Sequence, residues 1–178
     1  MKSILIGNRI PKEYFITKGT GESNIQMHAG SYHLALKEAG IESYNIMTYS
    51  SILPSIAKEI KQPKKLPHGC VMETIMATAN SSKGKRATAG IIFGWLYDKK
   101  TKKRYGGLVC EYNGNKTEKA AGKLLQLSLQ ELYKNGFEEK YTIKDTTLLS
   151  TSFIPKKKFG TALVALCFTS YKIPIIRR

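Results

Sequence analysis

The sequence is poor in the residues that build disulfide frameworks and metal centres. Its 178 residues include three cysteines and three histidines. Cys70, Cys110 and Cys167 are odd in number, far apart and never arranged as Cys-x-x-Cys, which argues against a disulfide scaffold and a zinc site. The histidines show no metal-ligand spacing either. We therefore expect no metal, and the unpaired thiols favour the reducing cytoplasm as the compartment.

Long hydrophobic runs are also missing. No apolar stretch approaches the roughly 20 residues that cross a bilayer as a helix. The N-terminal stretch 1–9 carries positive charge but has only three consecutive apolar residues, too few for a signal peptide. We expect no membrane partner.

Acidic residues are scarce, because 13 Asp and Glu stand against 29 Lys and Arg, for a formal net charge of +16. A basic surface attracts polyanions. However, the basic clusters at 61–65, 83–86, 99–104 and 156–158 fall where loops or strand ends are expected, and lysine, which dominates them, is a poor bidentate reader of bases. No nucleic-acid-binding motif is recognisable. The pattern does not favour nucleic acid as a partner, and binding to an acidic surface stays a secondary alternative.

The chain length fits one domain, 1–178, with its own core. Hydrophobic patterning predicts an α+β domain with a largely antiparallel sheet. The segment 19–21 is expected to form a glycine-rich turn, and 55–60 to be partly helical. The predicted helices are 30–39 and 117–135, and the predicted strands are 14–17, 44–49, 68–79, 87–97, 105–112, 139–153 and 159–170. The strand 87–97 is apolar on both faces and is therefore expected in the centre of a sheet.

The pair Ser50-Ser51 stands at the end of the predicted strand 44–49 and shortly before Pro54. In a strained turn the Ser51 hydroxyl can attack the Ser50 carbonyl, and the resulting ester can eliminate and hydrolyse. This sequence of steps leaves a pyruvoyl group on residue 51. A ketone forms a Schiff base with an amine and withdraws electrons, as pyridoxal phosphate does. The alternative for such a pair is an ordinary polar turn ahead of a proline.

Four blocks, in order along the chain, resemble the pyruvoyl-dependent arginine decarboxylases. The blocks are 39–54 (AGIESYNIMTYSSILP), 65–69 (KLPHG), 107–112 (GLVCEY) and 158–163 (KFGTAL). The last is similar to the C-terminal strand of the family's bacterial branch. The resemblance extends from about Glu22 to Ser170 and covers nearly the whole chain.

This resemblance implies a four-layer αββα sandwich that assembles as a homo-trimer or a dimer of trimers. It implies a zymogen that cuts itself between Ser50 and Ser51 into a β chain, 1–50, and an α chain, 51–178, with the pyruvoyl group as a covalent cofactor and no pyridoxal phosphate. By resemblance Asn45 assists processing and catalysis, and Glu111 is the catalytic glutamate. Leu36 and Ile52 match positions that line the substrate site.

Glu111 can also be interpreted from strand alternation, which places it on one face with Val109 and Asn113. That face is either solvent-exposed or part of a functional pocket. In a pocket, a carboxyl group kept protonated by burial could protonate the carbon from which carbon dioxide has left.

His33 departs from the family pattern, which has an aspartate at this position of the short helix. A carboxylate binds a guanidinium in a two-pronged pair, and histidine brings no negative charge. Glu38, Glu42 or an acid from a neighbouring subunit could compensate. The leading hypothesis is conversion of L-arginine to agmatine and carbon dioxide. The alternative is a substrate-altered or inactive homologue that acts as a basic oligomeric binding protein.

Overall fold

The computed structural model describes residues 6–64 and 66–176, which form two β-sheets, a short helical segment and one long helix. Residues 1–5 of the N-terminal stretch and Lys65 of the second sequence block lie outside the described residues. The elements are β1 (Ile10–Ser23), η1 (Met27–Tyr32), α1 (His33–Glu38), β2 (Asn45–Thr48), β3 (Ile52–Pro54), β4 (Lys58–Glu59), β5 (Val71–Ser82), β6 (Ala87–Asp98), β7 (Arg104–Gly114), α2 (Glu118–Gly136), β8 (Tyr141–Phe153) and β9 (Phe159–Lys172).

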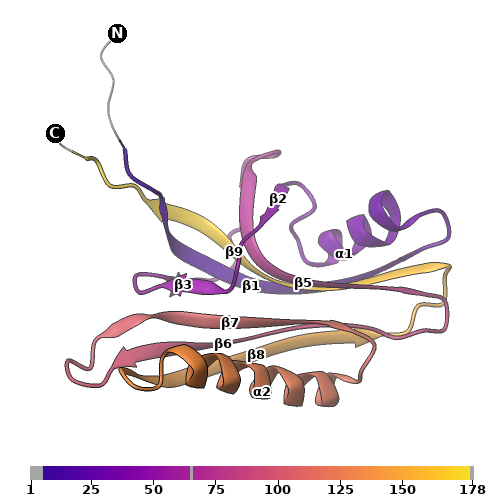
Figure 1. Cartoon of the computed structure of the whole chain (residues 1–178). Coiled ribbons are helices and arrows are strands. Elements are labelled where there is room, and N and C mark those ends of the chain that lie inside the picture. The colour runs from indigo at the N-terminus through magenta and orange to yellow at the C-terminus, as the bar shows by residue number, and fades with distance from the viewer. Residues whose placement is uncertain (1–5, 65, 177–178) are drawn as a thin grey trace, which may run out of the picture.

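The strands are divided between two sheets that lie face to face (Figure 1). The first sheet has the order β2-β5-β9-β1-β4, and its two outer pairs, β2 with β5 and β1 with β4, are parallel. The second sheet, β3-β7-β6-β8, is antiparallel throughout. The predicted α+β class is therefore confirmed. Hydrophobic patterning by itself indicates one sheet, whereas the strands form two.

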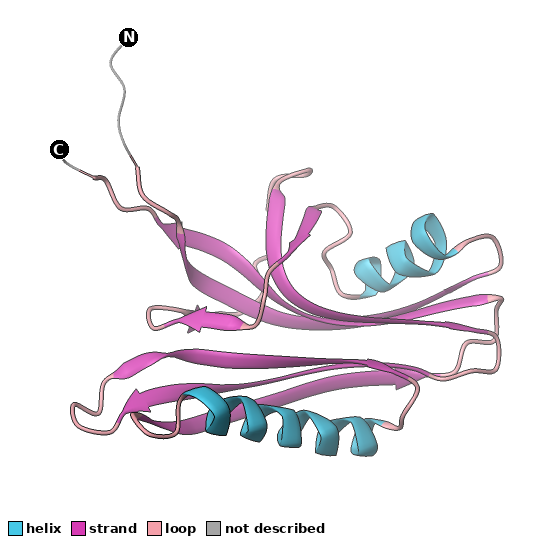
Figure 2. Cartoon of the chain, in the orientation of Figure 1, coloured by secondary structure: helices cyan, strands magenta, loops and turns pink. Residues whose placement is uncertain are grey.

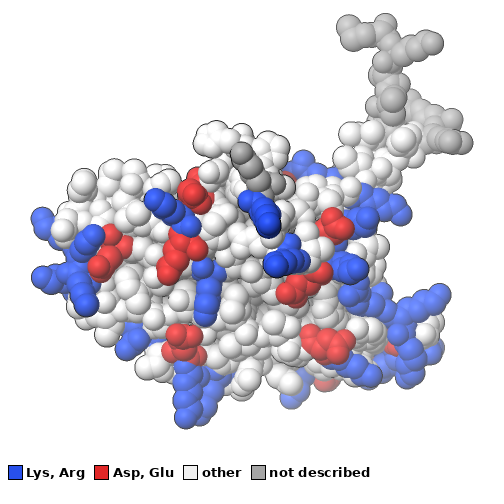
Figure 3. All heavy atoms as spheres, turned by 180° about the vertical axis from the view of Figure 1, so that it is seen from behind, with Lys and Arg blue, Asp and Glu red and all other residues white. Residues whose placement is uncertain are grey.

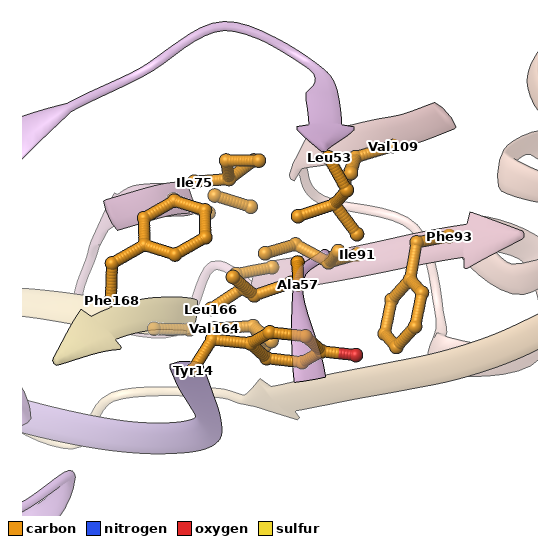
Figure 4. Packing of buried hydrophobic residues seen from close by; sticks show 14 of the residues in the cluster. Tyr14, Leu53, Ala57, Ile75, Ile91, Phe93, Val109, Val164, Leu166 and Phe168 are labelled. Carbon is orange, nitrogen blue, oxygen red and sulfur yellow. The ribbon is translucent and has the colours of Figure 1, made fainter. Parts of the chain in front are cut away.

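The main core fills the space between the sheets. Figure 4 shows side chains from both sheets meeting there, among them Leu166 from β9 and Ile91 from β6. Strand β6 is buried along most of its length because it has a sheet neighbour on each side and covered surfaces on both faces. Its predicted central position is confirmed.

The helices cover the outer faces of the two sheets (Figure 2). α1 packs Ala35 and Leu36 against the first sheet, together with Ala39 at its C-terminal end, and α2 packs Leu125 and Leu129 against the second. The α2 N-terminus is capped as predicted, because the Thr117 hydroxyl accepts a hydrogen bond from the Ala120 amide at 3.3 Å. The first helix begins earlier than predicted, with a π-helical turn in η1.

Two predictions about local structure are wrong. The segment 19–21 is not a turn, because it continues β1 in register with β9. Its glycines serve close packing: a Cβ on Gly19 would lie 2.2 Å from the Ala35 carbonyl oxygen, and one on Gly21 would lie 2.2 Å from that of Ser31. The segment 55–60 is not helical either, because Lys58 and Glu59 pair with β1 as the short strand β4.

Lysine and arginine side chains are distributed over much of the surface seen in Figure 3, with acidic side chains between them. Despite this excess of cations, residues 6–64 and 66–176 form one ion pair within 4.0 Å, between Arg9 and Glu73. Neither helix in this part of the chain combines the length and the apolar character needed to span a bilayer.

Replacement of Gly21 by alanine tests the close approach of the first helical segment to β1. We expect Gly21→Ala to lower the free energy of unfolding by about 1–3 kcal/mol, because the helix backbone must move to admit a methyl group. Urea denaturation measures the change. Gly136→Ala is the matched control, since a Cβ there meets no atom within 4 Å, and it should leave stability unchanged or slightly raised. Equal stability of the two variants would contradict the packing argument.

Candidate functional site

Ser50 and Ser51 lie where the chain crosses from one sheet to the other. β2 ends at Thr48 in the first sheet, and β3 begins at Ile52 in the second. The crossing is fixed at both ends by backbone hydrogen bonds: the Tyr49 amide donates to the Thr74 carbonyl at 2.6 Å, and the Val109 amide donates to the Ser51 carbonyl at 2.9 Å. The pair is thus joined to both sheets.

The backbone turns tightly at the serine pair. The Ile52 amide donates a hydrogen bond to the Ser50 carbonyl oxygen at 3.1 Å, which closes a three-residue turn centred on Ser51. Among the described residues other than glycine, only Lys102 and Asp145 have positive φ. The strained turn expected from the sequence is therefore a tight turn without left-handed backbone. Its hydrogen bond polarises the carbonyl that Ser51 would attack.

Glu111 is brought to Ser51 by the register of two strands. Ile52 of β3 pairs with Leu108 of β7, and the Val109 amide then bonds to the Ser51 carbonyl. Glu111 follows Val109 by two residues and so lies on the same face of β7, as a diagonal neighbour of Ser51. The Ser51 hydroxyl donates to the Glu111 carboxylate, with distances of 3.3 Å to Oε1 and 3.2 Å to Oε2.

The surroundings of Glu111 change its acidity. Val109 is fully buried between the sheets, whereas Glu111 lies further along β7 and is exposed in the single chain. Partial removal of water by neighbouring groups nevertheless raises the pKa of Glu111, while the hydrogen bond from Ser51 opposes the shift. Alternation along the strand correctly predicts the shared face. A raised pKa favours the protonated form that a proton donor needs.

Asn45 makes a different contact from the one expected. Its side-chain amide donates to the Gly69 carbonyl at 2.7 Å, and its backbone amide donates to the Cys70 carbonyl. Because Asn45 begins β2 and Ser50 follows its end, strand geometry separates them by roughly 15 Å. The single chain therefore does not bring Asn45 to the serine pair, and its catalytic role stays a prediction.

Ile52 borders an apolar hollow directly after Ser51. The hollow has a volume of about 370 Å³, and Leu53, Ile56, Tyr105 and Phe137 are among its lining residues. Ile52 itself is exposed. This position next to Ser51 is compatible with the apolar wall predicted for the substrate.

Leu36 and His33 lie away from the serine pair, in the helical segment on the outer face of the first sheet. They border a second hollow of about 410 Å³ together with His28, Ala29 and Tyr32. His33 is exposed, whereas most of Leu36 is buried in the core beneath the helix. Of the acids considered as substitutes for the family aspartate, Glu38 accepts hydrogen bonds from the amide and hydroxyl of Thr20.

Glu73 is a polar residue that the sequence analysis overlooked. It lies in β5 with 2% of its side chain exposed, and it forms an ion pair with Arg9. The available signal was a single acid inside an otherwise uncharged strand segment, Val71–Ala79. Nothing in the local sequence indicates its partner, which is 64 residues away.

The described residues contain no group of three or more His, Cys, Asp or Glu side chains that could hold a metal ion. The three cysteines are free, and burial raises the pKa of the Cys110 thiol to about 11. The polar groups at the serine pair are the Ser51 hydroxyl, the Glu111 carboxylate and the backbone amides of Ile52 and Val109.

Comparison of the sequence with known proteins relates the chain to one family. The model of the pyruvoyl-dependent arginine decarboxylases matches residues 13–173. A pyruvoyl-dependent arginine decarboxylase AaxB of Chlamydia abortus is 31% identical over 189 aligned positions, covering 93% of this chain and 94% of the relative. The pyruvoyl-dependent arginine decarboxylase of Thermoplasma volcanium is 29% identical over 153 positions, covering 78% and 82%. The resemblance expected from the four sequence blocks is confirmed, and the chain belongs to the pyruvoyl-dependent arginine decarboxylase family.

Proposed function

We propose that this chain is a self-processing decarboxylase that converts L-arginine to agmatine and carbon dioxide with a pyruvoyl group formed from Ser51. One observation carries the proposal beyond family membership. The Ser51 hydroxyl lies 3.2 Å from a Glu111 carboxylate oxygen. In the same turn, the Ser50 carbonyl accepts a hydrogen bond from the Ile52 amide. Nucleophile, carbonyl and a group able to exchange a proton are thus adjacent.

Self-cleavage requires bond changes that these groups can support. The Ser51 oxygen bonds to the Ser50 carbonyl carbon, and the peptide C–N bond breaks to leave an ester and an amine. Loss of the α-proton of residue 51 then expels the Ser50 carboxylate, and water replaces the nitrogen, which leaves as ammonia. The Ile52 amide is a ready donor to the oxyanion that forms on the Ser50 oxygen.

The strand pairing between β3 and β7 would hold the new chain end after the cut. The Ser51 carbonyl accepts from the Val109 amide at 2.9 Å, and Ile52 to Pro54 continue in register with β7. When formed, the pyruvoyl carbonyl supplies an electron sink for the bond to the departing carboxylate. Glu111 remains beside it, and its raised pKa supports donation of a proton to the substrate carbon.

Arginine as substrate is supported by the names of the relatives, because the carboxylate at the serine pair, Glu111, is assigned to proton donation. Because His33 replaces the family aspartate, the guanidinium would need Glu38, Glu42 or an acid from another subunit. The inactive alternative finds no support in the comparisons, whose reported relatives are named decarboxylases. Measurement of carbon dioxide release from a panel of amino acids separates the decarboxylase from an inactive homologue, because an inactive homologue releases none from any amino acid.

The finer description of the fold and assembly is part of the proposal. The arrangement of one helical segment, two facing sheets and a second helix supports a four-layer αββα sandwich. We propose that the cleaved protomers form a trimer in the cytoplasm. Each protomer would contribute one apolar hollow at Ile52 and one hollow at His33. A neighbouring copy could then bring His33 and Leu36 to the Ser51 site that the single chain keeps apart.

Intact-mass measurement tests the processing step. We expect the wild type to give two pieces, 1–50 and 51–178, with the second lighter by one ammonia than a simple hydrolysis product. Ser51→Ala should remain one chain because it has no nucleophile. The pair Ser81-Ser82, which is held in the ladder between β5 and β9, is an internal control and should stay joined. Active wild-type protein that is uncut would refute the mechanism.

Replacement of Glu111 by glutamine tests the proton donor. Glutamine keeps an oxygen that can accept from Ser51 but carries no acidic proton, so we expect Glu111→Gln to cut itself and to decarboxylate about 100- to 10,000-fold more slowly. Single-turnover measurement of carbon dioxide release on the cut protein gives the rate. Asn113→Ala, two residues along the same face, is the control. Full turnover by Glu111→Gln would remove the assigned role.

A further inference from the structure

Glu73 is a carboxylate in an unusually dry position. Its side chain is 2% exposed, and it lies on the face of β5 that Ile75 presents to the space between the sheets. One oxygen pairs with Arg9, while the other is buried and has no hydrogen-bond partner in the described part of the chain. A buried carboxylate is unfavourable unless it is paired, and Arg9 is the cation that offsets the burial of Glu73.

Arg9 connects this acid to two tyrosines. Its guanidinium lies 5.6 Å from the centre of the Tyr171 ring. Interaction with the Tyr49 hydroxyl raises the pKa of Arg9, and attraction to both tyrosines acts in the same direction. The Tyr49 ring in turn packs on Phe168, with ring centres 5.7 Å apart. Tyr49 is the residue directly before Ser50-Ser51.

β5 also holds the backbone at the same place. Glu73 is paired with Met47 of β2, and the next residue, Thr74, accepts the Tyr49 amide at 2.6 Å. That bond is the last of the β2 ladder before the chain turns to the second sheet. Two neighbouring residues of β5 thus hold Tyr49. Thr74 holds its backbone through a hydrogen bond, and Glu73 holds its side chain through Arg9.

Both strands that flank the Ser50-Ser51 peptide are short and lie at the edge of a sheet. On the downstream side, β3 has three residues, and its Leu53 is buried in the core between the sheets. On the upstream side, β2 has four residues, lies at the edge of its sheet and is largely exposed. Short edge strands open readily. Without a further anchor, the Ser50 carbonyl would move relative to the Ser51 hydroxyl.

We propose that Arg9 and Glu73 are a positioning pair for self-cleavage, which holds Tyr49 and so keeps the Ser50 carbonyl within reach of the Ser51 hydroxyl. The inference rests on the proposed function. It assigns the pair to the cleavage step, in which geometry of the reacting atoms sets the rate. It assigns the pair no part in turnover by chains already cut, because the Ser50–Ser51 bond no longer exists in them.

A time course of cleavage tests this assignment. Wild type and variants are made by cell-free translation, synthesis is stopped, and the fraction of cut chain is followed by gel and intact mass. We expect Arg9→Met, Glu73→Gln and Tyr49→Phe to cut about 10- to 100-fold more slowly than wild type. Arg9→Lys, which keeps a cation for Glu73, should recover most of the rate. Lys12→Met is the control, because it removes an exposed cation from the same segment.

Turnover of the cut fraction distinguishes positioning from general damage. Once cut, the slow variants should release carbon dioxide from arginine at the wild-type rate per cut chain. If Arg9→Met or Glu73→Gln fails to fold, the double variant Arg9→Met/Glu73→Met removes both charges together and should restore folding without restoring rapid cutting. Wild-type cutting rates in the folded single or double variants would overturn the inference and leave the proposed function intact. A wild type that never cuts would end both.

Discussion

The short crossing between the sheets is the constraint on which the candidate site depends. Only Tyr49, Ser50 and Ser51 separate the last residue of β2 from the first of β3. Facing sheets are typically about 10 Å apart, and the four steps from Thr48 to Ile52 span at most about 13 Å when extended, less with the tight turn at Ser51. The connection therefore has little slack, and the packing of the inter-sheet core sets where the serine pair lies. Changes that shift one sheet against the other should be felt at Ser51.

Strand register converts that constraint into chemistry. The pairing of β3 with β7 places Ser51 opposite Val109 and diagonal to Glu111, so the hydroxyl and the carboxylate meet without any flexible loop. The same pairing would retain the new chain end after cleavage. A single backbone arrangement thus serves the uncut chain, where the hydroxyl is the nucleophile, and the cut chain, where a carbonyl would stand in its place.

The two acids near the crossing, Glu73 and Glu111, differ in a way that fits two tasks. Glu73 is buried and paired with a cation, which suits a fixed anchor. Glu111 has no cation beside it among its pKa influences, and its pKa is raised, which suits exchange of a proton. The net charge of +16 does not give Glu73 and Glu111 the same surroundings, because most lysines lie on the surface and in hairpin turns.

The sequence by itself determined the α+β class, the long capped helix α2, the central strand β6 and the position of Ser50-Ser51 at the end of a strand. These follow from periodicity, capping and composition, which act over a few residues. It also misassigned Gly19 and Gly21 to a turn, because their role is to admit a helix backbone that packs from elsewhere. The tertiary structure alone decided which strands belong to each sheet, the meeting of Ser51 with Glu111 across 60 residues and the pairing of Arg9 with Glu73 across 64. Such contacts depend on which strands pair and in which register, and local patterns contain no information about the partner strand.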